Sequence, residues 1–263
     1  RQVTINAGDS AIFDVNDSTT LTQTGIVVNG ATSTLQKLGN GTFALNSASG
    51  NNFVGDILVS DGTLQFGSGD TVGNATDVTV SSGATFTITQ TEGIDGLSGA
   101  GNVSITGSAL LEVGLDNGST IFSGVISGSG GRFSKAGTGT QTLSGINTYT
   151  GTTTVNGGIL RLSGAGRLSD STDVTVNGGA TLDLNGVSDA IDTLSGTGDV
   201  TPGVGTLTLG ASNGSGTFDG TITEAGTLIK IGGGKQTLTN SGNAWTNGTQ
   251  ILGGELSISS ASQ

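Results

Sequence analysis

Residues 133–143 read Phe-Ser-Lys-Ala-Gly-Thr-Gly-Thr-Gln-Thr-Leu, and related stretches occupy residues 35–45 and 228–238. In each stretch an apolar residue is followed two places later by a lysine and then by a glycine-rich segment that leads to a leucine. The three lysines, Lys37, Lys135 and Lys230, are 98 and 95 residues apart. A recurrence of this length indicates that one supersecondary unit is used repeatedly.

Other landmarks keep the same step along the chain. Phe53, Tyr149 and Trp245 are 96 residues apart, and each lies two places after an asparagine. Residues 77–80 and residues 173–176 both read Asp-Val-Thr-Val. We therefore expect residues 1–263 to form a single continuous domain. Its long-repeat copies lie at approximately 35–130 and 131–227, with a partial copy at 228–263 and an N-terminal remnant at 1–34.

A shorter period of turn signals lies inside each copy. Gly41, Gly62, Gly83 and Gly107 are 21, 21 and 24 residues apart, and short stretches that alternate apolar and polar residues lie between them. Alternation favours strands, and the spacing is too short for a propeller blade of about 40–45 residues. The expected fold is all-β: a right-handed parallel β-helix (solenoid) of roughly a dozen coils on a long repeat of about 96 residues. Stacked at about 4.8 Å per coil, it would be a rod of roughly 55–60 Å.

The composition excludes several classes of function. Fifty of the 263 residues are glycine, and Cys, His and Met are absent. The chain therefore has no imidazole base, no thiol nucleophile and no zinc–thiolate site. Its net charge is -12 with 8 basic residues, too few to cover a phosphate backbone, so no nucleic acid partner is expected. It has no apolar run of about 18 residues, and we expect no membrane insertion by this segment.

Residues 133–162 closely resemble the passenger-associated transport repeat of Gram-negative autotransporters. Residues 135–145 fit the first half of that repeat and residues 147–162 fit the second, and residues 35–66 and 228–258 are weaker copies. Two departures occur: position 145 is Gly, and one residue is inserted between Trp245 and Gly248. The resemblance implies a secreted solenoid at the bacterial cell surface or in the extracellular space. It also implies that a C-terminal barrel carries such passengers through the outer membrane.

Two short motifs suggest catalysis or phosphate binding. Residues 210–214 (Gly-Ala-Ser-Asn-Gly) match a nucleophile elbow, but the elbow needs a histidine base and a strand-to-helix turn. Residues 232–235 (Gly-Gly-Gly-Lys) resemble part of a phosphate-binding loop, but Gln236 stands where Ser or Thr is required. We interpret both as turns between coils.

Carboxylates could form a glycosidase pair or bind calcium, and the candidate pairs are Asp14/Asp17, Asp170/Asp173 and Asp189/Asp192. A glycosidase pair stands about 5–10 Å apart in a cleft, and calcium-binding solenoids carry a Gly-Gly-x-Gly-x-Asp repeat, which is absent here. We favour turn positions for most of these residues.

Aromatic and threonine positions offer two further binding hypotheses. Phe53, Tyr149 and Trp245 could stack on sugars, but their spacing separates them by several coils, so packed aromatics at corners are favoured. Thr-x-Thr triplets such as residues 85–87 could form an ice-binding face, yet apolar middle residues fit ordinary strand alternation.

These observations predict a structural surface protein that forms a rigid stalk or fibre. An adhesin segment that binds glycan or host protein through a lateral face is the alternative, and a glycan-active solenoid enzyme is a remote one. An enzyme would need a charged groove, and Arg132, Lys135, Arg161 and Arg167 are the only local basic cluster. We expect no catalysis and no catalytic, cofactor-binding or metal-binding residues. The expected partners are a second copy stacked end to end, or covalent continuation in a longer chain.

Overall fold

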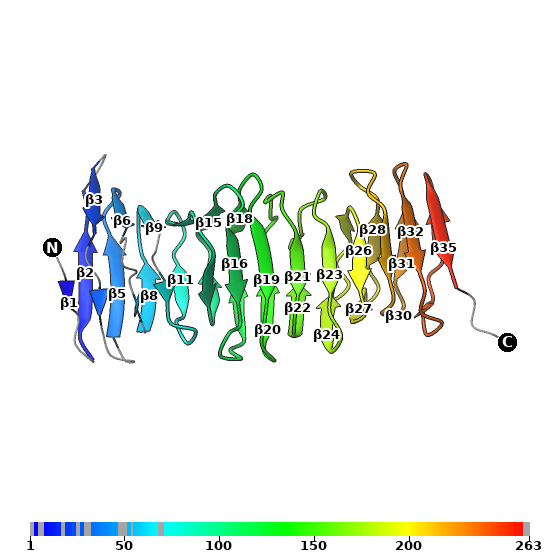
Figure 1. Cartoon of the computed structure of the whole chain (residues 1–263), viewed down its shortest axis with the longest axis horizontal. Coiled ribbons are helices and arrows are strands. Elements are labelled where there is room, and N and C mark those ends of the chain that lie inside the picture. Colours follow the sequence, from blue (N-terminus) through cyan, green and yellow to red (C-terminus); the bar gives the residue numbers. More distant parts are fainter. Residues whose placement is uncertain are drawn as a thin grey trace.

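The computed structural model describes residues 3–4, 8–16, 19–24, 27–28, 33–46, 52–53, 55–67 and 71–259. These residues form strands and turns without any helix, and the chain winds into a rod of about 11 turns (Figure 1). Each described strand pairs in parallel with the strand about one turn earlier or later. The predicted all-β parallel solenoid is therefore confirmed. The paired residues of neighbouring turns are 17 to 24 positions apart.

The rod has three strand-bearing faces, which the chain visits in a fixed order. The first face is a sheet of 12 strands. Its strands are β2 (Ser10–Asp14), β5 (Ser33–Leu38), β8 (Gly55–Val59), β11 (Val78–Val80), β14 (Leu97–Gly99), β17 (Thr120–Phe122), β20 (Thr140–Leu143), β22 (Gly158–Leu162), β24 (Ala180–Asp183), β27 (Asp199–Thr201), β30 (Thr221–Glu224) and β33 (Ala244–Trp245).

The second face consists of a six-stranded and a four-stranded sheet with an interruption between them. The six-stranded sheet contains β3 (Thr20–Gln23), β6 (Thr42–Leu45), β9 (Thr63–Phe66), β12 (Thr85–Ile88), β15 (Asn102–Ile105) and β18 (Val125–Ser127). The four-stranded sheet contains β25 (Asp189–Ile191), β28 (Thr206–Leu209), β31 (Thr227–Lys230) and β34 (Thr249–Ile251).

The third face is a nine-stranded sheet preceded by two short pairs. The sheet contains β13 (Glu92–Ile94), β16 (Leu110–Val113), β19 (Arg132–Lys135), β21 (Thr153–Val155), β23 (Val174–Val176), β26 (Leu194–Gly196), β29 (Gly216–Phe218), β32 (Lys235–Leu238) and β35 (Glu255–Ile258). The pairs are β1 (Val3–Thr4) with β4 (Val27–Val28) and β7 (Asn52–Phe53) with β10 (Thr71–Val72). β4 lies against β7, and β10 lies against β13.

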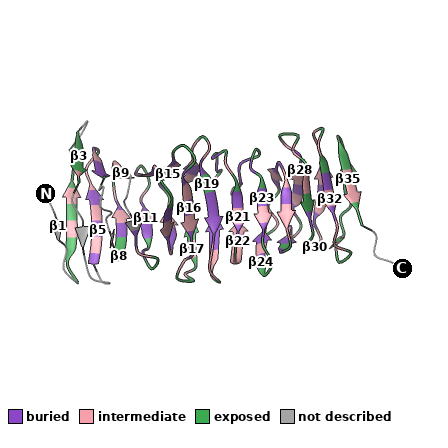
Figure 2. Cartoon of the chain, in the orientation of Figure 1, coloured by how far each residue is buried: buried purple, intermediate pink, exposed green. Residues whose placement is uncertain are grey.

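A single apolar column fills the rod. Along β12 the residues alternate, so that Phe86 and Ile88 are buried while Thr85 and Thr87 lie nearer the surface. The same alternation recurs through the middle of the rod, whereas β3 and β35 near its two ends are more exposed (Figure 2). Each turn covers the apolar side chains of its neighbours, which is how a solenoid buries a core that no single turn could form.

Glycines allow the corners of successive turns to lie in contact. Gly62 has a φ of 60°, and a Cβ at this position would lie 2.4 Å from the carbonyl oxygens of both Gly39 and Gly41. Of the four turn glycines in the sequence, Gly62, Gly83 and Gly107 have positive φ, whereas Gly39 takes that conformation in place of Gly41. The predicted corners are therefore present, with a local shift at the first.

The long repeat does not span a whole number of turns. Lys37 lies in β5 on the first face, Lys135 in β19 on the third and Lys230 in β31 on the second. Each step covers four turns and two further faces, or 4⅔ turns. Equivalent residues of successive copies therefore lie on different faces of the rod, rotated by one face at each copy.

Candidate functional site

The strand ladder of the second face is broken over two turns between β18 and β25. Residues 144–152 and 163–173 pass through this region as loops. The described backbone forms only one isolated bridge there, between Ile146 and Arg167. This break in the second face is the candidate site.

The Asn147 side chain replaces the missing backbone partner at the break. Its Oδ1 accepts a hydrogen bond from the Ile126 amide of β18 at 2.9 Å, and its Nδ2 donates to the Arg167 carbonyl at 2.7 Å. Asn243 repeats the first contact, since its Oδ1 accepts from the Ile222 amide at 2.8 Å. The asparagine two places before the aromatic position therefore accepts a hydrogen bond from a strand amide that would otherwise have no acceptor.

The aromatic position lies inside the rod at the break. Tyr149 is fully buried, and its hydroxyl is 2.6 Å from Thr153 Oγ1. Burial raises the pKa of the Tyr149 phenol. Phe53 is also buried, and Trp245 is half-buried with its Nε1 donating to Thr249 Oγ1 at 2.8 Å. The side chains of Phe53 and Tyr149 are therefore not available for stacking on sugars. Their burial fits the interpretation of these residues as packed aromatics.

Asp189 supplies a second side-chain acceptor to the break. Its Oδ2 accepts from the Leu168 amide at 3.1 Å, whereas its buried Oδ1 has no hydrogen-bond partner. Burial raises the pKa of the Asp189 carboxyl to about 7. The amide groups of Leu168 and Ala190 and the Arg167 guanidinium lower the pKa, and Asp170 raises it further. Near neutral pH this carboxyl is therefore poised between its charged and neutral forms.

Two adjoining hollows lie over the break. One of about 390 Å³ is bordered by Ile146, Asp170 and Ser212, and one of about 290 Å³ by Ser188, Asp189 and Thr208. Arg167 and Asp170 line both hollows. Asp170 and Asp189, which belong to adjacent turns and to two different candidate pairs, thus line the same hollow.

The repeated lysines lie in the core rather than at a surface site. Lys37, Lys135 and Lys230 are completely buried, and burial lowers the pKa of each ammonium group. The Lys37 Nζ donates to the carbonyls of Leu38 and Gly39 at 2.6 Å and of Asp61 at 3.2 Å. We had not predicted this burial, although each lysine stands two places after an inward apolar residue, which places it on the inward side of its strand.

The glycine-rich loop that resembled a phosphate site, and its counterpart in the preceding copy of the repeat, contain carbonyl groups that accept hydrogen bonds from these lysines. The Lys230 Nζ donates to the carbonyls of Ile231 and Gly232. Lys135 makes the equivalent contacts with Ala136 and Gly137. Lys235, the lysine of the phosphate-loop pattern, is exposed and pairs with Glu255 at 2.6 Å.

The other candidates from the sequence occupy corners. Ser212 of the nucleophile-elbow pattern lies in a strand-to-strand turn, where Asp192 Oδ1 accepts from the amides of Ser212 and Gly214 at 2.7 and 2.8 Å. Asp173 Oδ1 accepts from Thr193 Oγ1 at 2.7 Å. Asp14 ends β2, and Asp17 lies outside the described residues.

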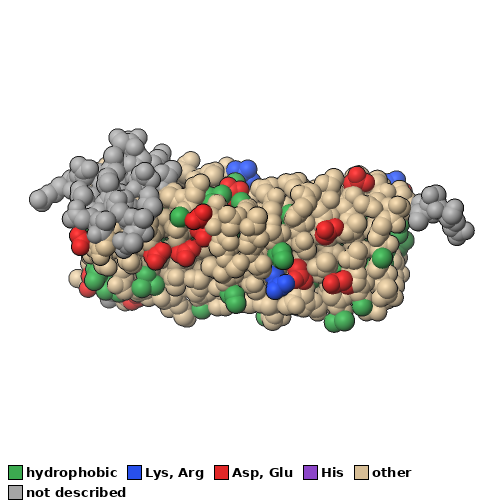
Figure 3. Space-filling view, turned by 90° about the horizontal axis from the view of Figure 1, so that it is seen from below, with side chains coloured by type: hydrophobic (Ala, Val, Ile, Leu, Met, Phe, Trp, Pro, Cys, Tyr) green, Lys and Arg blue, Asp and Glu red, His purple; other side chains and the backbone are tan. Residues whose placement is uncertain are grey.

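The suspected basic cluster is dispersed over the rod. Arg132 is exposed on the third face, Lys135 is in the core, Arg161 is on the first face and Arg167 is at the break of the second. Figure 3 shows one side of the rod, where charged side chains are scattered over a mainly neutral surface. The part of the chain that the structure describes has no group of three acidic side chains placed to hold a metal ion. It has no helix that could cross a membrane.

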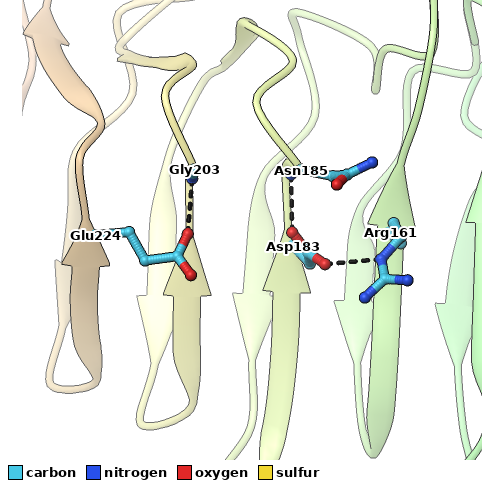
Figure 4. Close-up of polar contacts among 5 residues, drawn as sticks. All are labelled: Arg161, Asp183, Asn185, Gly203 and Glu224. Carbon is cyan, nitrogen blue, oxygen red and sulfur yellow. Dashed lines mark hydrogen bonds and ion pairs between the residues drawn. The ribbon is translucent and has the colours of Figure 1, made fainter.

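Carboxylates on the first face are paired with neighbouring turns (Figure 4). Arg161 Nε donates to Asp183 Oδ2 at 2.7 Å, and the Asn185 amide donates to Asp183 Oδ1 at 2.7 Å. Two turns after Asp183, Glu224 Oε2 accepts from the amide of Gly203, which lies in the turn between them, at 2.8 Å. These contacts hold the corner loops in place, so the carboxylates of Asp183 and Glu224 have a structural role.

Most of the chain is similar in sequence to known proteins. The passenger-associated-transport-repeat family matches residues 35–66, 133–162 and 228–258. Over 240 residues, or 89% of the chain, the sequence is 34% identical to the adhesin BmaC autotransporter of Brucella suis biovar 1 (strain 1330). The chain is an autotransporter passenger repeat protein. It spans 6% of the length of that adhesin, and no solved structure matches it.

The resemblance noted in the sequence is thereby confirmed in the same three segments. Passenger repeat proteins of this type belong to the extracellular surface of the bacterial cell, which confirms the predicted location. The relative is named as an adhesin.

Proposed function

We propose that this passenger segment serves as a rigid spacer within a surface adhesin. The observation that carries the proposal is the uninterrupted first-face sheet of 12 parallel strands over one continuous apolar column. Bending such a rod would separate backbone hydrogen bonds and open the core on one side. A stack of about 11 turns would hold whatever lies beyond it about 53 Å from its base.

Adhesion through a lateral face is the second candidate function. Two observations favour it: the relative carries the name of an adhesin, and the second face is hollowed where its ladder is broken. Catalysis is not part of either candidate, because the four basic residues that could have formed a charged groove lie on three faces and in the core.

End-to-end stacking of separate chains remains a prediction beside continuation in a longer chain. Small-angle X-ray scattering over a concentration series tests it together with the rod shape. A spacer predicts a constant cross-section and a maximum dimension of about 50–70 Å at every concentration. Growth of that dimension with an unchanged cross-section would support stacking, and a scattering curve of an expanded chain would contradict the spacer.

A further inference from the structure

The Arg167 guanidinium forms no close ion pair with a described residue, although its charge acts on the Asp189 carboxyl from farther away. Its only hydrogen bond among the described residues is from Nη1 to the Gly166 carbonyl at 2.7 Å. The ion pairs of the described chain are Arg161–Asp183 and Lys235–Glu255, so no carboxylate lies within 4.0 Å of Arg167. Arg167 is half-buried, and it has several N–H donors that remain open to a ligand.

The surroundings of Arg167 are rich in hydroxyl groups. Ser171 and Ser212 border the hollow on one side of it, and Ser188 and Thr208 border the hollow on the other. Ile146 pairs with Arg167 across the isolated bridge and is 57% exposed. Short hydroxyls around an open apolar side chain suit a sugar ring, which offers hydroxyl groups at its edge and C–H groups on its face.

The carboxyl groups near Arg167 complete the pattern. Asp170 is exposed at the rim shared by both hollows and can accept hydrogen bonds from sugar hydroxyls. Asp189, which is 96% buried, borders the second hollow, and its buried Oδ1 has no hydrogen-bond partner. An unpaired buried polar atom is uncommon in folded proteins and marks a place where a donor is missing.

We propose that the two hollows bind an acidic sugar residue, such as a uronic or a sialic acid, with its carboxylate on Arg167. A guanidinium binds a carboxylate through two parallel hydrogen bonds, which makes Arg167 the anchor. The hydroxyl groups of the sugar then contact Asp170 and the flanking serines, and its apolar face lies against Ile146. This inference rests on the lateral-adhesion candidate and names its ligand class.

The test is a titration of the chain with 3′-sialyllactose, trigalacturonic acid and lactose, followed by saturation-transfer NMR. Sialyllactose and trigalacturonic acid distinguish a sialic acid from a uronic acid source, and lactose is the neutral control. Arg167→Gln is expected to weaken binding of the acidic sugar at least about tenfold. Arg132→Gln is the matched control. Arg132 also donates one side-chain hydrogen bond to a backbone carbonyl, and its substitution removes the same charge from another face.

A second variant guards against a folding defect in Arg167→Gln. Asp170→Asn removes a negative charge beside Arg167 but keeps an acceptor for sugar hydroxyls. It is expected to tighten binding of the acidic sugar about twofold to fivefold at low salt, which general damage to the fold would not do.

The possible results separate this inference from the proposed function. Binding of lactose alone, or equal losses of acidic-sugar binding in the two arginine variants, would overturn the acidic-sugar site. The first of these results would leave lateral adhesion standing. If no sugar binds, the acidic-sugar site fails, while lateral adhesion to a host protein is left untouched and the spacer is judged by scattering alone.

Discussion

The ammonium group of Lys135 lies inside the rod and is solvated there by backbone carbonyls instead of water. Its Nζ donates to Ala136 and Gly137 of its own turn and to Gly157 of the next turn at 3.4 Å. Gly114 of the preceding turn leaves room for it, because a Cβ there would lie 2.9 Å from Nζ. At the residue scale, the lysine of the repeat is therefore a clamp: its ammonium group links two adjacent turns through hydrogen bonds to their carbonyls.

Substitution of this clamp tests the assignment. Lys135→Met keeps the apolar stem but leaves carbonyl oxygens at the corner without donors. We expect the free energy of unfolding to fall by about 1–3 kcal/mol, measured by urea denaturation. Lys235→Met is the matched control and should cost less than about 1 kcal/mol, because its ion pair is exposed. Equal effects of the two variants would show that the buried ammonium does not stabilise the corner.

Asp189 gives the fold a dependence on pH. Its pKa of about 7 in the folded chain lies above the ordinary value of 3.8. The folded state therefore holds the proton more tightly, and the stability from this group, present below about pH 4, is lost as the pH rises through 7. Asp189→Asn removes the charge that burial penalises next to Arg167 and Asp170.

The expected result is a difference between two pH values. At pH 8, Asp189→Asn should raise the free energy of unfolding by roughly 1–3 kcal/mol relative to the wild type. At pH 4 the two chains should differ much less. The measurement is chemical denaturation of both chains across this range, and a difference that does not change with pH would refute the assignment.

At the scale of the strand, close stacking requires glycine where one turn crosses another. β14 ends at Gly99, whose φ is 101° and where a Cβ would lie 2.0 Å from the Val80 carbonyl oxygen. Gly196 ends β26 in the same way, with a φ of 103° and a distance of 2.1 Å from the Val176 carbonyl oxygen. Gly99 and Gly196 are equivalent positions of the long repeat, so the same close contact between turns occurs on two faces of the rod.

Two alanine variants separate crowding from backbone conformation. Gly99→Ala should destabilise the chain by at least about 2 kcal/mol, since it adds a clash to an unfavourable φ. Gly107 has a φ of 58°, but the space around an added Cβ is open. Gly107→Ala should therefore lower the free energy of unfolding by only about 1 kcal/mol. Thermal unfolding of both variants gives the comparison. If the two losses were equal, the turns would not be in contact at Gly99.

The strands themselves could be predicted from sequence because short alternating runs and turn glycines mark them directly. The alternating runs at residues 78–80 and 85–88, for example, are β11 and β12. The burial of Lys135 was not predicted, because the sequence does not show which carbonyls meet its ammonium group. Nor did the motifs reveal the hollow beside Arg167, which depends on a missing strand and on residues from several turns.

At the scale of the whole molecule, the rotation of the repeat was not predicted either. The sequence shows a step of 96 residues but not how many turns fill it, because a turn takes between 17 and 24 residues depending on its corners. With 4⅔ turns per copy, equivalent surfaces of a longer passenger would lie on all three faces in succession. We expect three copies to complete 14 turns before a surface returns to its starting face.

Distances between spin labels test this winding most directly, and the chain has no native cysteine to interfere. Ile121 and Thr223 lie on the first face five turns apart, about 24 Å along the rod. Ile121 and Thr217 are repeat equivalents on the first and third faces, separated by 4⅔ turns, or about 22 Å along the rod.

The measurement is double electron–electron resonance on the two double-cysteine variants. The account predicts about 24 Å between the backbone positions of the first pair. It predicts a longer distance for the second pair, because its labels point from different faces. A repeat of four or five whole turns would place the second pair on one face, no farther apart than the first, and that result would contradict the rotating solenoid.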